Sequence, residues 1–111
     1  MLYIKGNDIK LTRGDTLYLT IPITNGEEEY IVQSDDTLTF SVKKMLSDSD
    51  YKIQKVIIGN NTFHIEPSDT ANLPFGRYYY DIELLTAAGD VYTIIDTSLF
   101  ELLTEVTCCG E

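Results

Sequence analysis

Apolar and polar residues alternate with a period of two along much of this chain, as they do in a β-strand that buries one face. The clearest case is the segment 77–84, whose even positions are all apolar or aromatic: Tyr78, Tyr80, Ile82 and Leu84. Its odd positions include Asp81 and Glu83, whose carboxylates would be costly to bury. The pattern therefore predicts a central strand with its even positions in the core and both carboxylates facing water.

Three further segments alternate in the same way, at 16–24, 37–43 and 62–66. In the first of them, Pro22 indicates an edge or a bulge, because its nitrogen cannot donate to a β-ladder. In the other two, the inward positions are expected to be Leu38, Phe40, Val42, Phe63 and Ile65. Each segment predicts a strand with one buried face.

The register of the segment 52–58 is left open by its sequence. One strand register places Ile53 and Ile57 inward, and the other places Val56 and Ile58 inward. Both sets are apolar, so the alternation alone does not choose between them.

Two other parts of the chain predict strands of a different kind. The segments 91–95 and 99–103 are apolar on both faces, which is typical of a central strand or a covered surface. Residues 2–12 predict one or two short strands, broken at 6–8.

Turn-forming residues separate these strands. Glycine occurs in four short polar segments, 13–15, 25–27, 59–61 and 88–90. The last of them lies between two strong strand patterns and predicts a hairpin tip. The segment 68–73 lies between two prolines and predicts one short helical crossover, capped by Ser68 or Asp69. Seven to eight short strands separated in this way predict an all-β, antiparallel β-sandwich.

The length and the net charge of the chain limit the number of domains and the kinds of partner that it can have. A chain of 111 residues fits a single domain, 1–111. Its 18 acidic and 8 basic residues give a net charge of −10, which excludes nucleic-acid binding driven by phosphate neutralisation. No apolar stretch approaches the roughly 20 residues of a membrane helix, and the start has no signal-peptide pattern. We therefore expect no membrane partner and synthesis in the cytosol.

The two cysteines, Cys108 and Cys109, are adjacent and close to the end of the sequence. Neighbouring cysteines close a strained ring when they bond to each other, and two ligands are too few for a structural zinc site. We expect a reduced pair in a disordered C-terminal tail, 105–111.

Candidate catalytic and metal-binding residues are few. His64 is the only histidine, and no nucleophile is presented beside it, so we interpret it as a solvent-facing strand residue. The acidic clusters at 27–29, 35–36 and 48–50 lack the spacing of a calcium loop and are interpreted as solvated loops. The tripeptide Arg13-Gly14-Asp15 matches an adhesion signal, and we interpret it as a turn that opens a strand. We expect no catalytic, metal or cofactor-binding residues and no enzymatic activity.

Tyrosines supply the candidate binding surface. Tyr18 and Tyr79 occupy outward positions of their predicted strands. Together with Tyr92 and Ile94, in the segment that is apolar on both faces, they form a candidate protein–protein interface. The other interpretation of these residues is an ordinary exposed surface.

The segment 67–84 resembles part of a known family. It combines the short helical crossover with the pattern Pro-x-Gly-x-Tyr-x-Tyr-Asp and an alternating strand, and the segments 11–16, 36–42 and 89–95 are also similar. Over residues 9–104 the chain resembles small β-sandwich domains of phage and prophage tails. Among them it is most similar to the immunoglobulin-like N-terminal domain of phage upper baseplate proteins, which attach receptor-binding proteins to the tail. The resemblance implies an immunoglobulin-like sandwich with a role in assembly, and it carries over no catalytic residue.

Two functions are therefore expected. The first is a non-enzymatic structural or adaptor module of a phage or prophage tail or baseplate, located in the virion, whose partners are other phage structural proteins or copies of itself. The alternative is a small carbohydrate-type ligand-binding module. An assembly module should have a flat apolar patch or an unprotected edge strand, whereas a carbohydrate module should gather aromatic side chains in one shallow groove.

Overall fold

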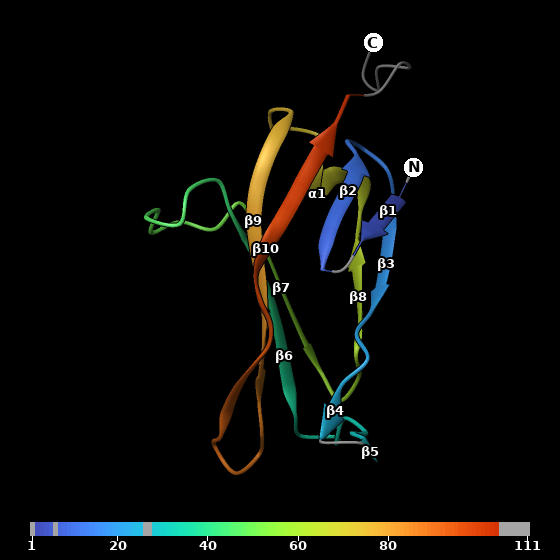
Figure 1. Ribbon diagram of the computed structural model, residues 1–111, viewed down its shortest axis with the longest axis vertical. Helices are drawn as coiled ribbons and strands as arrows, with labels where there is room; N and C mark the ends of the chain where they lie inside the picture. Colours follow the sequence, from blue (N-terminus) through green and yellow to red (C-terminus); the bar gives the residue numbers. More distant parts are fainter. Residues whose placement is uncertain (1, 6, 26–27, 105–111) are drawn as a thin grey trace.

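The computed structural model describes residues 2–5, 7–25 and 28–104, which form two layers of β-strands and one short helix (Figure 1). Within these residues the elements follow the order β1 (Leu2–Lys5), β2 (Asp8–Thr12), β3 (Leu17–Thr20), β4 (Thr24–Asn25), β5 (Glu28–Glu29), β6 (Thr37–Lys43), β7 (Ile53–Ile58), β8 (Thr62–Ile65), α1 (Pro67–Thr70), β9 (Gly76–Leu85) and β10 (Val91–Leu103). The expected cysteine pair and tail, 105–111, lie outside the described residues. The strands exceed the expected seven to eight because β4 and β5, two residues each, form a small ribbon of their own.

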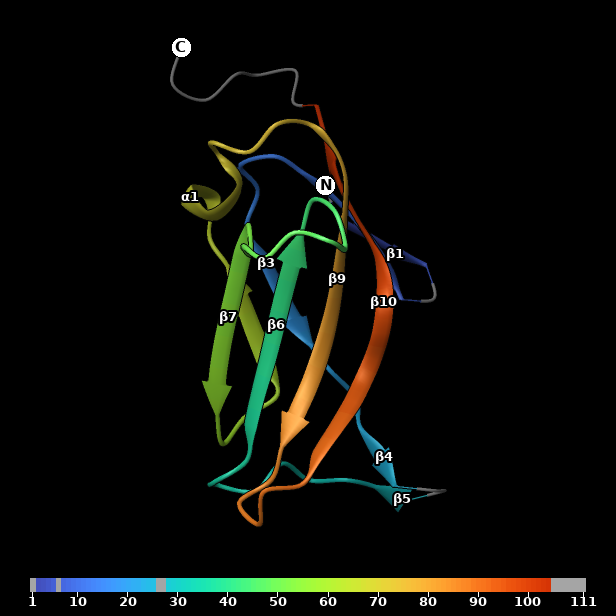
Figure 2. The same cartoon turned by 90° about the vertical axis from the view of Figure 1, so that its left-hand side faces the viewer.

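The larger layer is a six-stranded sheet in the order β1-β2-β10-β9-β6-β7, and β3 pairs with β8 in the layer opposite. Figure 2 shows the outer side of the larger sheet, with β7, β6, β9 and β10 next to one another. The all-β sandwich is thus confirmed. One pairing departs from the antiparallel arrangement, because β10 runs parallel to β2. Whether two strands run parallel or antiparallel depends on how the chain turns between them. The alternation of apolar and polar residues within a strand carries no information about those turns.

The hydrophobic core lies between the two layers. Its buried side chains are Ile9, Leu11, Leu17, Leu19, Ile21, Ile23, Leu38, Phe40, Val42, Ile53, Phe63, Ile65, Tyr78, Tyr80, Ile82, Leu84, Phe100 and Leu102. The register of the segment 77–84 is confirmed, since its four even side chains are at most 3% exposed. Glu83 faces water and Asp81 is half-buried. The strand is central, because β9 pairs with β10 on one side and β6 on the other.

The structure selects one register for β7. Ile53 and Ile57 point toward the core, while Val56 and Ile58 are 56% and 63% exposed on the outer side. This register also turns Lys55 inward, since it lies opposite the buried Phe40 on β6.

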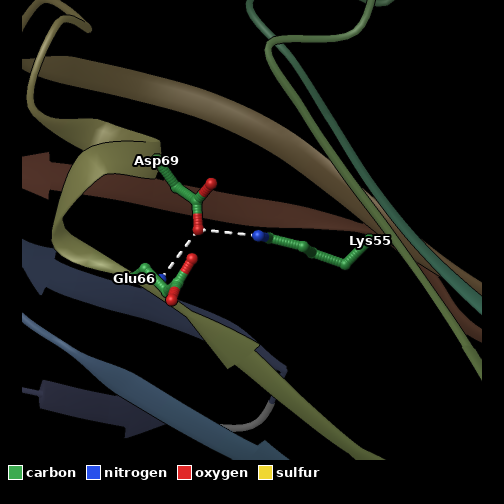
Figure 3. A network of polar contacts seen from close by, with 3 residues as sticks. All are labelled: Lys55, Glu66 and Asp69. Carbon is green, nitrogen blue, oxygen red and sulfur yellow. Dashed lines mark hydrogen bonds and ion pairs between the residues drawn. The ribbon is translucent and has the colours of Figure 1, made fainter.

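The Lys55 side chain reaches a charged partner at the edge of the core. Its Nζ lies 2.8 Å from a carboxylate oxygen of Asp69 in α1 (Figure 3). The same oxygen accepts a hydrogen bond from the backbone amide of Glu66, at 2.7 Å. Asp69 therefore caps the short helix and fixes it to the edge strand of the opposite layer.

Two predicted strands differ in detail from the expected segments. The ladder of β3 ends at Thr20, before Pro22, but Ile21 and Ile23 are still buried, so the alternation continues where the pairing stops. The two apolar segments after residue 90 form one strand, β10, whose register against β9 shifts between Thr93 and Ile95 and again before Ser98. Bulges of this kind let successive residues approach the same face, which accounts for an apolar pattern without alternation.

The turn at Arg13-Gly14-Asp15 is part of the fold, and Gly14 adopts a φ of 87° there. The Gly14 amide donates to Oγ1 of the buried Thr70 in α1, at 2.9 Å. The Arg13 guanidinium donates to the carbonyl oxygen of Leu73 and lies 4.0 Å from the centre of the Phe75 ring. These contacts support a structural interpretation of the tripeptide.

Tyr78 forms a corner at the start of β9. Its hydroxyl donates to the carbonyl oxygen of Pro74, four residues earlier, at 2.7 Å. A tyrosine that bonds back to the preceding backbone at the start of the penultimate strand is a feature of immunoglobulin-like sandwiches. The corner closes the crossover that contains α1.

We expect Tyr78→Phe to lower the free energy of unfolding by about 0.5–1.5 kcal/mol, because it removes one hydrogen bond and leaves the ring packed. Urea denaturation of the wild type and the variant would measure the difference. The control is Tyr79→Phe, which removes a hydroxyl from the outer face of the same strand. Equal effects of the two changes would show that the corner bond contributes nothing specific.

Candidate functional site

The structure does not bring the four predicted interface residues onto one surface. Tyr79 lies on the outer side of β9, whereas Tyr18 lies on β3 in the opposite layer, where its ring stacks on His64 with centroids 4.4 Å apart. Tyr92 lies opposite the buried Leu84, so it belongs to the inner face of the sheet. Ile94 lines the same cleft as Tyr92 and is partly buried.

The outer face of the six-stranded sheet carries an exposed apolar row at one end. Thr37 on β6 lies directly opposite Ile58 on one side and Leu85 on the other, and Leu85 in turn lies opposite Val91. Facing residues of neighbouring strands share a face, so these side chains form a continuous line. Ile58, Leu85 and Val91 are 63%, 44% and 59% exposed. We call these three residues, with the exposed Val56 beside them, the apolar row.

The surroundings of the apolar row are acidic. Glu83 lies on the same face of β9 as Leu85, two residues earlier, and Asp90 directly precedes Val91. The backbone of residues 34–36 lies beside Gly59 at the end of β7, which places the exposed Asp35 near Ile58. All three carboxylates are on exposed residues.

The opposite end of the same face carries a basic loop. The connection 44–52 between β6 and β7 projects outward from the sheet (Figure 1), and its exposed apolar residues are Met45, Leu46 and Tyr51. We define the basic loop as residues 43–52, and its cations are Lys43, Lys44 and Lys52. The Lys43 Nζ lies 5.0 Å from the centre of the Tyr51 ring. Arg77 on β9 lies next to the loop, since its carbonyl oxygen accepts a hydrogen bond from Lys44 at 3.1 Å.

A polar hollow separates the apolar row from the basic loop. It has a volume of about 310 Å³ and is lined by Thr39, Ser41, Lys43, Leu46, Tyr51, Gln54, Tyr79, Tyr80, Asp81, Glu83 and Thr97. Desolvation in the hollow raises the pKa of Asp81, and the nearby charge of Lys43 opposes that shift. Two tyrosines, Tyr51 and Tyr79, therefore stand beside hydroxyl, amide and carboxylate groups.

A second depression opens at the inner side of the sandwich. This cleft has a volume of about 480 Å³ and is lined by Pro22, Ile23, Thr24, Tyr30, Leu84, Thr86, Tyr92, Thr93 and Ile94. The hydroxyl of Tyr30 donates to a carboxylate oxygen of Asp36 at 2.5 Å, and the Gln33 amide donates to the same oxygen at 2.9 Å. Asp36 is only 2% exposed, so the expectation of a solvated loop at 35–36 was wrong for this residue. Asp36 is buried because the Tyr30 hydroxyl donates to its carboxylate, and the residues next to Asp36 in the sequence do not indicate this contact.

We expect Asp36→Asn to destabilise the fold at neutral pH and to have a smaller effect in acid. The Tyr30 hydroxyl, and then the Gln33 amide, lower the pKa of Asp36 below its ordinary value. A lowered pKa in the folded state gives stability that is present above about pH 4 and is lost as the pH falls through the folded value. Urea midpoints of both proteins at pH 7 and below pH 3 would measure this. The exposed neighbour gives the control, Asp35→Asn, and a gap between wild type and Asp36→Asn that does not shrink in acid would contradict the account.

Within the described residues, no group of three or more His, Cys, Asp or Glu side chains is placed to hold a metal ion. His64 is exposed and stacked on Tyr18, as expected for a solvent-facing strand residue. No helix among the described residues has the length and apolar character needed to cross a membrane.

The chain was compared with protein-family models, with curated proteins and with solved structures, and no match was found in any of the three.

Sequence reasoning missed the apolar row. Val56 and Ile58 belonged to the register that the structure rejects for the core, so their exposure was one of two open possibilities. Leu85 directly follows the buried Leu84, and this break in alternation was the signal that one of two neighbouring leucines faces outward.

Proposed function

We propose that this protein is a structural or adaptor module of a phage or prophage tail or baseplate, acting through the outer face of its six-stranded sheet. The observation that carries the proposal is the apolar row, whose exposed side chains lie on β7, β9 and β10, with Thr37 of β6 between Ile58 and Leu85. Contiguous exposed apolar side chains bordered by polar residues are typical of protein–protein interfaces. The resemblance of residues 9–104 to phage tail sandwich domains supports the particular setting.

The rigidity of this face suits an assembly role. The strands that carry the apolar row pack their inner sides into the core through Leu38, Ile82 and Leu84. A surface that is already ordered loses little conformational entropy when it docks, so more of the contact energy appears as affinity. The function is therefore geometric, and it requires no reacting group.

Purified phage particles provide the test. The chain should be found in assembled tails by mass spectrometry at a fixed ratio to the major tail protein, and Leu85→Asp should abolish its incorporation. Tyr18→Asp, on the opposite layer, is the matched control and should be incorporated normally. Absence of the wild-type chain from assembled tails would overturn the proposal.

A saccharide-binding function is the second candidate, favoured by the polar hollow. Tyr51 and Tyr79 offer aromatic surfaces, and Ser41, Gln54 and Asp81 offer hydrogen-bonding groups beside them. Aromatic rings with a few placed polar groups are what a small polar ligand requires. Titration of a panel of saccharides monitored by backbone amide NMR would test it, with Tyr51→Ala as the variant. Shifts confined to the hollow and lost in that variant would support binding, and an unshifted spectrum at millimolar saccharide would exclude it.

A further inference from the structure

Both ends of the outer face expose apolar side chains, but their charges have opposite signs. The apolar row is bordered by Asp35, Glu83 and Asp90, with no lysine or arginine on the neighbouring outward positions of the strands that carry it. The basic loop and the adjoining Arg77 carry four cations against three carboxylates, which are Asp48, Asp50 and Glu101, the residue opposite Arg77 on β10. Asp48 already accepts a hydrogen bond from the Met45 amide, at 3.1 Å.

We propose that this protein forms a two-fold symmetric dimer in which the basic loop of each copy packs on the apolar row of the other. The inference rests on the proposed assembly function, because it uses the same face, and it names a second copy of the chain as the partner. Met45, Leu46 and Tyr51 would contact Ile58, Leu85 and Val91, and the cations around the loop would meet the carboxylates around the row. Potentials of opposite sign at an interface select the partner and its orientation.

The position of the two surfaces explains why the assembly closes as a dimer. Lys43 and Thr37 are the two ends of β6, six residues apart, which is about 20 Å in a strand. Since both surfaces lie on one face, a rotation by half a turn between facing copies brings each loop onto the other copy's row at once. An interface of this isologous kind is complete with two copies. Two complementary surfaces on different faces would instead give a ring or an open filament.

The centre of the face explains why the contact is made at its ends. Asp81 and Glu83 lie between the loop and the row, one on each side of the two-fold axis, so that Asp81 of one copy faces Glu83 of the other. Their mutual repulsion opposes a flat contact, and the polar hollow between the loop and the row leaves space for water there. Lys43, which lines the same hollow, offsets part of the charge of Asp81. The loop projects beyond the sheet and is therefore the part that reaches the second copy (Figure 1).

Charge-swapped variants test the arrangement. The first variant, Lys52→Glu with Arg77→Glu, makes the loop end acidic, and the second, Asp35→Lys with Asp90→Lys, makes the row end basic. All four side chains are exposed, so the fold should be retained, which circular dichroism would verify. Analytical ultracentrifugation should give a dimer for the wild type and a dissociation constant at least about 10-fold higher for each variant alone. An equimolar mixture of the two should recover the dimer, because both of its loop–row contacts then join opposite charges.

Each outcome of this experiment supports or overturns the dimer. A wild type that is monomeric at every concentration overturns it, as do variants that dimerise like the wild type or a mixture that stays monomeric. Leu46→Asp, on the exposed loop, is an independent variant that should dissociate the dimer without touching the core. A monomer that is still incorporated into tails would overturn the dimer alone, whereas a dimer that is absent from tails would overturn the assembly function alone.

Discussion

Replacing Phe40 with alanine is expected to lower the free energy of unfolding by about 3–5 kcal/mol, the usual cost of deleting a buried aromatic ring. Phe40 is fully buried on the central strand β6. Its ring centroid lies 5.6 Å from that of Phe63 in the opposite layer, 5.3 Å from Tyr80 and 6.1 Å from Phe100. One change therefore removes contacts to β8, β9 and β10, and the surrounding strands cannot collapse into the space without breaking their ladders.

Since small domains are stable by only about 5–15 kcal/mol, this loss should bring the protein close to unfolding at 37 °C. The midpoint of urea denaturation would measure it. The control is Thr39→Ala, the neighbouring residue on the outer face of β6, which should shift the midpoint little. A Phe40→Ala variant as stable as this control would contradict the position of Phe40 at the junction of the layers.

The double change Leu85→Ser, Val91→Ser is expected to abolish self-association at concentrations where the wild type is dimeric. Removing the contact of a Leu or Val side chain at an interface costs about 1 kcal/mol. In a two-fold dimer the two changes give four truncations, and their total of about 4 kcal/mol should raise the dissociation constant several hundred-fold. Both residues are exposed, at 44% and 59%, so the core keeps its packing.

Sedimentation of the double variant across a concentration series would measure the change, and a thermal melt would confirm the fold. Tyr18→Ser gives a matched control, because Tyr18 is 66% exposed and lies in the other layer. Equal dissociation of the control and the double variant would mean that the outer face of the six-stranded sheet is not the interface.

The core strands could be predicted because each is a local pattern. In β6 and β9 every second residue is apolar. The hydrophobic effect buries that side of the strand, whichever strands lie next to it. The same logic gave the hairpin tip at 88–90, where Gly89 has a φ of 94°. The short crossover was also predicted, although its helix is confined to Pro67–Thr70.

The features that depend on distant partners could not be predicted. The register of β7 places Lys55 between the layers, and only the position of Asp69 makes that acceptable. Asp36 is buried because Tyr30, six residues earlier, bends back to donate to it. Neither partner is marked in the sequence by spacing or residue type.

The sequence predicted an exposed binding surface that includes tyrosine, but it did not predict which residues lie together on that surface. A tyrosine on the outer face of β9 was expected and observed, but the register shifts of β10 turn Tyr92 toward the cleft and away from Tyr79. The apolar row depends on which residues face one another across four strands. That information is a property of the sheet register and not of any one segment.

The parallel pairing of β2 and β10 has a mechanical consequence. Ile9 faces Phe100 and Thr12 faces Leu103, so the two strands point the same way along their common ladder. Tension applied between the start of β2 and the end of β10 therefore acts along the strands and loads these hydrogen bonds in shear, together rather than one after another. An antiparallel hairpin pulled from its two free ends opens like a zipper, one bond at a time. β2 and β10 are thus joined in the geometry that best resists stretching along the strand axis.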